Sequence, residues 1–284
     1  MKKAPLLCSL ALAISATSSI ADERFADVEM QMQALAGSVH MLVGAGGNIG
    51  VSAGPDGVLI VDDQYAPLAD KISAALQGVG SEGPKYIINT HYHGDHTGTN
   101  AFFGGQPGTT IFAHENVRVR LASGEDIDPN SLPVVTYKEG INFHFNDETI
   151  HVLHLPNGHT DGDSVVWFEK SNVLHTGDLF FKDWFPYIDI DAGGNVLGYI
   201  ASVTKMLDMI NDDTQIIPGH GALATKADLS RFRDMIVETN DYVQALKSTG
   251  KSEDDIVSTG LEDKWQSWAW QFIGEERWIR TLYR

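Results

Sequence analysis

Thr90-His91-Tyr92-His93-Gly94-Asp95-His96-Thr97-Gly98 is the stretch around which the rest of the chain is organised. Four side chains that can bind metal ions fall within six residues, directly after the apolar run Tyr86-Ile87-Ile88. His91 and His93 alternate on an extended segment, so both imidazoles can face one side. The chain then changes direction, so Asp95 and His96 can face a second ion. Binding a cation relieves the repulsion among such crowded groups, so the stretch predicts the floor of a metal site.

Three further candidate ligands follow predicted strands, each beside glycine or proline. They are His159 in Pro156-Asn157-Gly158-His159-Thr160, Asp178 in His175-Thr176-Gly177-Asp178, and His220 in Pro218-Gly219-His220-Gly221. Imidazole nitrogens and carboxylate oxygens are ligands that zinc accepts in enzymes, usually with one position left open for water. Ligands in loops after four separate strands form a constellation, which is a stronger signal than one motif.

The rest of the pattern predicts strands separated by helices. Short apolar runs joined by glycine-containing turns predict three antiparallel strands at 39–43, 49–53 and 58–61. Further strands are expected at 86–89, 110–113, 134–137, 141–145, 149–155, 165–168, 172–174 and 215–217, and helices at 67–79, 97–103, 114–121, 197–210, 227–246 and 265–284. The order indicates a single domain of two β-rich halves packed on each other, with helices outside.

The glycines at 44, 46, 47 and 50 lie between the first two strands or at their ends. A phosphate-binding loop would need a following Walker lysine and a helix, and this stretch has neither. We therefore expect a mobile hairpin over a site.

The first 21 residues have the pattern of a secretory signal peptide. Lys2 and Lys3 form a basic start, residues 6–14 a short apolar core, and Ser19-Ile20-Ala21 a cleavage site with small residues. The predicted mature domain is 22–284, in the periplasm or secreted. Cys8 is the only cysteine and lies inside the signal, so the mature chain would have neither a disulfide nor a thiolate.

The charge of the chain restricts its partners. The formal net charge is −18 and is spread along the sequence, which disfavours nucleic acids and anionic membrane surfaces. No stretch after the signal reaches the roughly 18 apolar residues of a membrane helix. We expect a small-molecule substrate and no stable membrane insertion, while the sequence does not indicate an oligomeric state.

The motif His91-x-His93-x-Asp95-His96, followed by the three later ligands, resembles that of the metallo-β-lactamase superfamily. The resemblance covers nearly the whole mature chain and implies an α/β fold, the four-layer αββα sandwich, with two zinc ions per chain. It implies a first zinc bound by His91, His93 and His159, a second bound by Asp95, His96 and His220, and a bridging carboxylate, Asp178. Asp62 resembles the carboxylate that orients a ligand imidazole in this family.

The resemblance implies a hydrolase. Two close zinc ions lower the pKa of a shared water and polarise a carbonyl, and Asp95 is the catalytic candidate that accepts the proton and passes it to the leaving group. We expect a small cyclic or activated carbonyl substrate, with a β-lactam or a lactone leading. Cysteine-bearing β-lactamases usually have a lysine where this chain has Phe181. The bridging Asp178 is typical of glyoxalase II and lactonases.

Two alternatives remain open at this point. One is thioester hydrolysis of the glyoxalase II kind, which fits the ligands but not the expected compartment. The other is a metal-dependent accessory or binding protein with little turnover, which the complete set of seven ligands disfavours.

Several other residues have two interpretations. Lys182 is either a carboxylate-binding residue or a solvated lysine, and residues 184–187 are either a substrate wall or core. The C-terminal tryptophans are expected to anchor a helix. Structural or surface roles are expected for the remaining histidines, with His175 also a candidate to support the site: His40, His114, His144, His151, His154 and His175.

Overall fold

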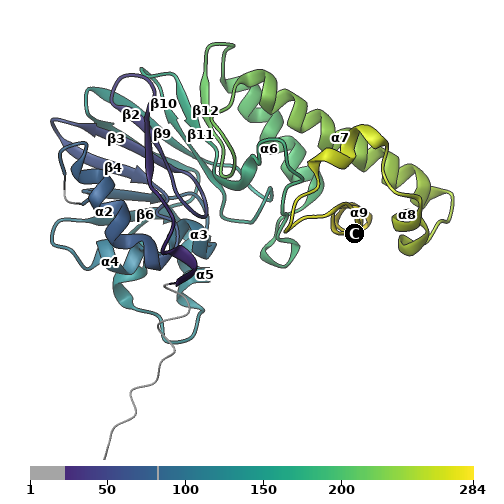
Figure 1. Cartoon of the computed structure of the whole chain (residues 1–284), viewed down its shortest axis with the longest axis horizontal. Coiled ribbons are helices and arrows are strands. Elements are labelled where there is room, and N and C mark those ends of the chain that lie inside the picture. Colours follow the sequence, from purple (N-terminus) through teal and green to yellow (C-terminus); the bar gives the residue numbers. More distant parts are fainter. Residues whose placement is uncertain (1–22, 82) are drawn as a thin grey trace, which may run out of the picture.

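The computed structural model describes residues 23–81 and 83–284, so the predicted signal segment 1–21 lies outside the described residues. Two sheets face each other and helices cover both outer faces, with the first half of the chain on one side and the second half on the other (Figure 1). The expected four-layer αββα sandwich is confirmed.

The first sheet contains seven strands in sequence order. The first four strands form an antiparallel meander, because tight turns join them. The last four strands are parallel, because helical crossovers connect them. The strands are β1 (Gln31–Ala34), β2 (Val39–Val43), β3 (Ile49–Gly54), β4 (Gly57–Val61), β5 (Tyr86–Asn89), β6 (Thr110–His114) and β7 (Val135–Tyr137).

The second sheet contains five strands in the spatial order β12-β11-β10-β9-β8. All its pairs are antiparallel except β11 with β12. The chain leaves the sheet between β11 and β12 to form a helix, which permits their parallel pairing. The strands are β8 (Gly140–Phe145), β9 (Glu148–His154), β10 (Ser164–Phe168), β11 (Val173–His175) and β12 (Gln215–Ile217).

The helices lie in two outer layers. The layer on the first sheet contains η1 (Ala66–Leu68), α2 (Ala69–Gln77), α3 (Gly94–Thr97), α4 (Asn100–Gly104), α5 (Glu115–Ala122) and η2 (Pro129–Ser131). The second half of the chain contributes η3 (Gly177–Leu179), η4 (Ile190–Ala192), α6 (Val196–Met209), α7 (Lys226–Ser248), α8 (Glu253–Thr259), η5 (Asp263–Trp268) and α9 (Glu275–Tyr283). The last helices extend beyond the sandwich, on the side away from the first sheet (Figure 1).

Three apolar clusters hold the layers together. The central cluster joins inward residues of both sheets, such as Ile88 and Val166. A second cluster packs α2 residues, including Ile72, on the outer face of the first sheet. The third packs α6 and α7 on the second sheet and includes Phe232 and Trp278. Successive side chains along a strand point to opposite faces of the sheet, and apolar residues occupy both faces. Each sheet is therefore buried on both sides.

The structure differs from the sequence prediction in two places that matter for the site. The expected helix 97–103 is two short helices, and α3 begins at Gly94, so Asp95 and His96 lie on a helical turn. The expected last helix 265–284 is divided into η5 and α9 by residues 269–274. The strand β1 and the helix α8 were not expected. Among the described residues, no helix has the length and apolar character needed to cross a membrane.

Candidate metal centre

One edge of the sandwich collects the ends of five strands. β4 and β5 are parallel neighbours, so Asp62 and the motif from His91 onward leave their strands at the same edge. In the second sheet β9, β11 and β12 run in one direction, because two antiparallel steps separate β9 from β11. Their following loops carry His159, Asp178 and His220. The topology therefore brings together residues that are up to 158 positions apart in the sequence.

The structure brings all seven sequence-predicted ligands together in two groups. One group contains His91, His93, His159 and Asp178, and the other contains Asp95, His96 and His220. Within the first group, Nδ1 of His93 lies 2.8 Å from Nε2 of His159. Within the second, Nε2 of His220 lies 3.3 Å from Oδ2 of Asp95. The division matches the one that the resemblance implied for two ions.

Asp178 lies between the two groups and offers one oxygen to each. Its Oδ2 is 3.7 Å from Nε2 of His91 and 3.5 Å from Nε2 of His159. Its Oδ1 is 3.1 Å from Nε2 of His96 and 3.3 Å from Nε2 of His220. A carboxylate oriented in this way can serve as a ligand to two ions at once.

Four of the five imidazoles are fixed through one nitrogen, which leaves the other directed into the cluster. His96 donates from Nδ1 to Oδ2 of Asp62 at 2.7 Å, and His159 donates from Nδ1 to the Tyr187 carbonyl at 2.7 Å. Nδ1 of His91 lies 3.0 Å from the Thr90 hydroxyl, and Nε2 of His93 lies 2.9 Å from Asp189. Such outer partners set the tautomer and orientation of metal-binding imidazoles.

Two buried atoms of the cluster make no hydrogen bond of acceptable geometry: Nε2 of His91, and Oδ1 of Asp178, which has only close contacts with the His96 and His220 rings. Leaving buried polar atoms unpaired costs free energy, so each requires an explanation. A divalent cation between the groups would satisfy both atoms, and imidazole and carboxylate together are a donor set that zinc accepts. The residues therefore fit a metal centre.

Protonation equilibria inside the cluster show the same division. Burial lowers the pKa of His91 well below its usual value and lowers that of His159 to about 4, so both rings are neutral near pH 7. Burial also lowers the pKa of His220, but the Asp178 carboxylate outweighs it and the pKa rises to about 9. Burial raises the pKa of Asp178, but nearby His96 and His220 hold it well below its usual value. Without a metal, protons on the His96 and His220 imidazoles balance the negative charge of the carboxylates. A bound metal ion would replace these protons.

Asp62 supports the cluster from β4, as the resemblance implied. It is fully buried, and it accepts hydrogen bonds from the Thr90 backbone N–H at 2.7 Å, from the Thr90 hydroxyl at 2.8 Å and from His96. Its φ of 64° lies in the left-handed region, which aspartate tolerates better than most residues. The strained backbone thus aims the carboxylate at both His96 and the start of the motif.

The glycine-rich turn between β2 and β3 lies over the cluster, as expected, and hydrogen bonds anchor it there. Gly47 donates its N–H to the Asp95 carbonyl at 3.0 Å, and Gln64 donates to the Gly47 carbonyl at 2.8 Å. A Cβ on Gly47 would lie 2.2 Å from Cε1 of His96. The glycine is required for this close approach, and the hydrogen bonds anchor the turn in the conformation that the structure shows.

A hollow of about 900 Å³ opens above the cluster. Its floor includes His93, Asp95, Asp178 and His220. The remaining lining residues form its walls: Arg24, Gly46, Tyr65, Tyr92, Gly94, Phe181, Tyr187, Asp189, Trp270, Gln271 and Phe272. The hollow is large enough for a small-molecule substrate directly over the candidate ligands.

Residues 42–220 match the family model of the metallo-beta-lactamase superfamily, and this segment contains all seven candidate ligands. The chain belongs to the metallo-β-lactamase superfamily. Its cluster of histidine and aspartate side chains is the metal-binding arrangement of a superfamily member, and the superfamily is hydrolytic.

Several superfamily relatives are similar over part of the chain. A protein of Aquifex aeolicus is 32% identical over 54% of this chain and 74% of its own length. The hydroxyacylglutathione hydrolase of Nitrosococcus oceani is 30% identical over 59% of both chains. That of Methylococcus capsulatus is 33% identical over 34% of both. The chain thus spans about one third to three fifths of the length of these two hydrolases.

Solved structures share the fold of this chain. The DIM-1 metallo-beta-lactamase aligns with a TM-score of 0.63 at 18% identity, over 75% of this chain and 99% of that one. The sec-alkylsulfatase Pisa1 from Pseudomonas sp. aligns with a TM-score of 0.67 at 13% identity, over 89% of this chain and half of that one. At such low identity these matches establish the architecture and leave the substrate open.

The remaining sequence candidates lie outside this superfamily cluster. Lys182 donates to the Leu223 carbonyl at 3.1 Å and lies 3.4 Å from Asp228, so it holds α7 rather than facing the hollow. His175 is buried and donates to the Asn48 carbonyl at 3.0 Å, which anchors the glycine-rich turn. Of residues 184–187, Phe185 is core and Tyr187 lines the hollow, so both interpretations apply in part.

Asp189 is the main site residue that the sequence reasoning missed. Its Oδ2 accepts a hydrogen bond from the Tyr92 hydroxyl at 2.6 Å and lies 2.9 Å from Nε2 of His93. Burial raises the pKa of Asp189, but the bonds from Tyr92 and His93 outweigh it and lower that pKa below its usual value. The residue is a single acid in a loop 96 positions from His93, and it belongs to no recognisable motif. No local sequence signal marked it.

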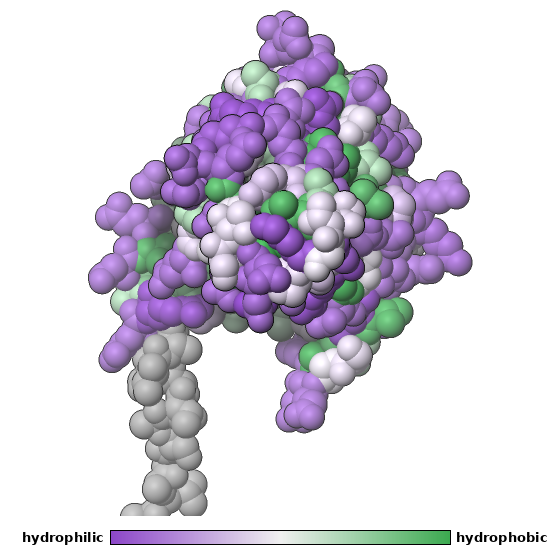
Figure 2. All heavy atoms as spheres, turned by 90° about the vertical axis from the view of Figure 1, so that its right-hand side faces the viewer, coloured by the Kyte–Doolittle hydropathy of each residue, from purple (hydrophilic) through white to green (hydrophobic). Residues whose placement is uncertain are grey.

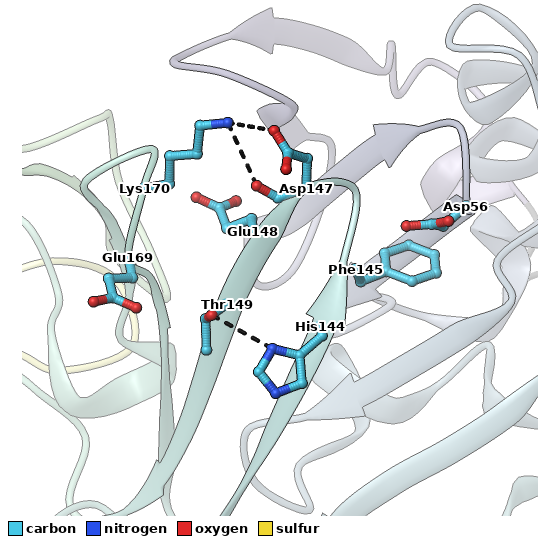
Figure 3. A pocket seen from close by; sticks show the side chains of 8 residues that line it. All are labelled: Asp56, His144, Phe145, Asp147, Glu148, Thr149, Glu169 and Lys170. Carbon is cyan, nitrogen blue, oxygen red and sulfur yellow. Dashed lines mark hydrogen bonds and ion pairs between the residues drawn. The ribbon is translucent and has the colours of Figure 1, made fainter.

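A second hollow, of about 610 Å³, lies away from the superfamily cluster, at the turn between β8 and β9. Figure 3 shows its lining side chains, among them Asp56 and Glu169 on opposite sides and Lys170 reaching Asp147. Of the seven candidate ligands, none lines it. Three of the histidines assigned structural or surface roles, His144, His151 and His154, also lie on these two strands.

Proposed function

We propose that the protein is a dinuclear-zinc hydrolase that opens a small cyclic or activated carbonyl substrate, such as a lactone or a β-lactam. The observation that carries the proposal is the position of Asp178, with one carboxylate oxygen facing each ligand group. We assign His91, His93 and His159 to the first ion, Asp95, His96 and His220 to the second, and Asp178 to both.

When bound, two zinc ions would acidify a water molecule and polarise the substrate carbonyl. The chain supplies the remaining requirements. The hollow admits a small molecule, and the fixed tautomers of His91, His96 and His159 keep one nitrogen of each ring directed into the cluster. Because these partners are in place before any ligand binds, little reorganisation is needed.

Asp95 is the proposed proton carrier. Its carboxylate lines the hollow, and Oδ2 lies 3.3 Å from Nε2 of His220 and 3.7 Å from Nε2 of His96. Burial raises its pKa, but His96 and His220 outweigh burial, so the carboxylate is ionised near neutral pH. An ionised Oδ2 at this place can accept the proton of the attacking water and donate it to the leaving atom.

Thioester hydrolysis is the second candidate. The observation that favours it is the similarity to hydroxyacylglutathione hydrolases, at 30% identity over 59% of the chain in one case. The same ligands and the same proton carrier would serve, with sulfur as the leaving atom. The difference between the candidates lies in the part of the substrate that contacts the walls of the hollow.

The test is zinc content followed by a substrate panel. We expect two zinc ions per chain by elemental analysis, and hydrolysis of at least one of three probes: a chromogenic cephalosporin, an acyl-homoserine lactone and a glutathione thioester. A protein that carries two zinc ions and hydrolyses no probe would instead support the accessory or binding role. A protein that binds a single ion would overturn the dinuclear assignment.

We also propose that the protein is exported, because residues 1–21 carry the features of a signal peptide. N-terminal sequencing of the protein from a cell fraction tests this proposal. A start at Asp22 in the periplasm or medium is expected, whereas an uncleaved chain in the cytoplasm would contradict it.

A further inference from the structure

Residues 269–274 form an irregular segment between η5 and α9, beyond the end of the superfamily match at residue 220. Three of its residues, Trp270, Gln271 and Phe272, line the hollow above the metal cluster. The C-terminal part of the chain therefore reaches back to the active edge of the sandwich.

The segment is held firmly on its inner side. Phe185 donates its backbone N–H to the Trp268 carbonyl at 2.9 Å, and the Trp270 indole donates to the Phe185 carbonyl at 2.9 Å. The Trp270 ring also stacks on Trp184, with centroids 5.1 Å apart. Ile273 is buried in the outer core. These contacts fix the position of Trp270 and Phe272 relative to the cluster.

Phe272 keeps 49% of its surface exposed, although it is a large apolar side chain. Its ring packs edge-on against Tyr187, with centroids 5.4 Å apart, and the Arg277 guanidinium lies 4.3 Å from its centroid. Arg277 also donates to the Phe272 carbonyl at 2.9 Å. An aromatic ring that is held by such contacts and remains exposed beside a cavity is suited to bind an apolar group.

The aromatic surface is continuous down to the candidate ligands. The Tyr187 ring lies 5.7 Å from His93 and 5.6 Å from His159, between centroids. On the other side, Phe181 stacks on His220 at 5.0 Å and lies 6.2 Å from Trp270. We call Phe181, Tyr187, Trp270 and Phe272 the aromatic wall. It begins at both metal groups and ends at the rim.

Polar and charged side chains also line the hollow, among them Arg24, Asp95 and Asp189. The four rings of the aromatic wall therefore supply most of the apolar surface that a substituent could contact there. The outward face formed by the C-terminal helices is mostly hydrophilic, with hydrophobic residues scattered over it (Figure 2). The aromatic residues of this region are thus used at the hollow and do not form a broad apolar patch on that face.

We propose that the aromatic wall binds an aryl or alkyl group attached to the scissile carbonyl. The preferred substrates are then esters, lactones or thioesters with an apolar group on the carbonyl side. The inference rests on the proposed function for the reaction, but the binding of the apolar group can be measured without turnover. Burial of such a group against aromatic rings supplies binding free energy that a small acetyl group lacks.

The first experiment uses the zinc-loaded, full-length mature protein and compares 4-nitrophenyl phenylacetate with 4-nitrophenyl acetate. We expect a higher kcat/KM for the phenylacetyl ester, and a fall of about tenfold in this preference in Phe272→Ala. Phe272→Leu keeps an apolar side chain and should keep part of the preference. Phe102→Ala is the matched control, because Phe102 is 40% exposed on α4 and does not line the hollow.

The second experiment measures binding alone. Titration of the protein with phenylacetate and with acetate, followed by tryptophan fluorescence, should give tighter binding of phenylacetate in the wild type and in Phe102→Ala, and a loss of that difference in Phe272→Ala. If neither the esters nor any of the three panel probes is hydrolysed but phenylacetate binds through Phe272, the reaction assignment fails and the wall is supported. If esters are hydrolysed with no dependence on Phe272, the reaction stands and the wall proposal is overturned.

Self-association is the remaining use for an exposed aromatic rim. Analytical ultracentrifugation distinguishes it: a dimer that Phe272→Ala converts to a monomer, together with equal binding of phenylacetate and acetate, would show that Phe272 is a subunit contact and would overturn the proposal.

Discussion

The two hollows of this molecule contain similar residue types but differ in what those residues can do. The hollow over the cluster and the hollow at the β8–β9 turn are both lined by carboxylates and histidine. In the first, seven side chains converge from the loops after four strands, and two buried atoms lack a hydrogen bond of good geometry. In the second, Lys170 pairs with Asp147, and both are largely exposed. Convergence and burial, rather than the number of acids, distinguish a metal centre.

The second hollow has one feature that resembles the first. Oε2 of Glu148 is buried without a hydrogen-bond partner, while its Oε1 accepts the Ser171 N–H at 2.5 Å. Within residues 23–81 and 83–284, however, groups of three or more convergent ligand atoms occur only at the two halves of the cluster. One unpaired oxygen cannot replace the several ligands that a divalent cation needs.

The sharpest test of this contrast is Asp178→Ala. Removing the carboxylate between the two groups should lower the zinc content below two per chain and abolish most hydrolysis, because both ions lose a shared ligand. Elemental analysis and the substrate panel measure the two effects. Glu169→Gln is the control in the second hollow and should retain full zinc content. Equal zinc content in Asp178→Ala and wild type would contradict the bridging role.

A smaller loss is expected for Asp62→Asn. Asparagine tolerates the left-handed backbone at this position but lacks the charge that holds His96. Loss of an outer partner of a metal-binding imidazole typically lowers metal affinity about 10- to 100-fold. Competition for zinc with a chromogenic chelator measures this change. An affinity equal to that of the wild type would show that Asp62 acts only on the fold.

Asp189→Asn should have a weaker effect of the same kind. Asp189 contacts His93 from the rim of the hollow and is more exposed than Asp62, so solvent screens its charge more strongly. We expect zinc affinity to fall by about tenfold or less. Asp191→Asn, an exposed position in the same loop, is the matched control. The idea that Asp189 orients His93 fails if both variants have the same affinity.

The smallest effect is expected at the second hollow itself. Lys170 and Asp147 are solvent-exposed, and exposed ion pairs contribute little to stability. Lys170→Ala should change neither the melting temperature nor the zinc content measurably. A clear loss of zinc in this variant would mean that the two hollows are coupled, and the contrast between them would not hold.

Local sequence patterns were sufficient for the ligands and for most of the fold. The ligands His159, Asp178 and His220 each follow a strand and lie beside glycine or proline, and the other four are crowded into one motif after a strand. Residue type, this spacing and the family resemblance together gave all seven positions. Strand and helix periodicity predicted most elements, such as α6 and β5, within a few residues. Boundaries were least predictable where short-range signals compete: the helix expected from 97 begins at Gly94, directly inside the motif.

Only the tertiary structure decided how these residues are used. The division of Asp178 between two groups, the contact of Asp189 with His93, and the approach of Gly47 to His96 all join segments that are distant in the sequence. The return of Trp270 and Phe272 to the hollow is of the same kind. Periodicity reports which face of an element is apolar, whereas such contacts depend on how complete layers pack. The sequence therefore determined the candidate ligands, and the packing of the sandwich determined their partners and the walls of the site.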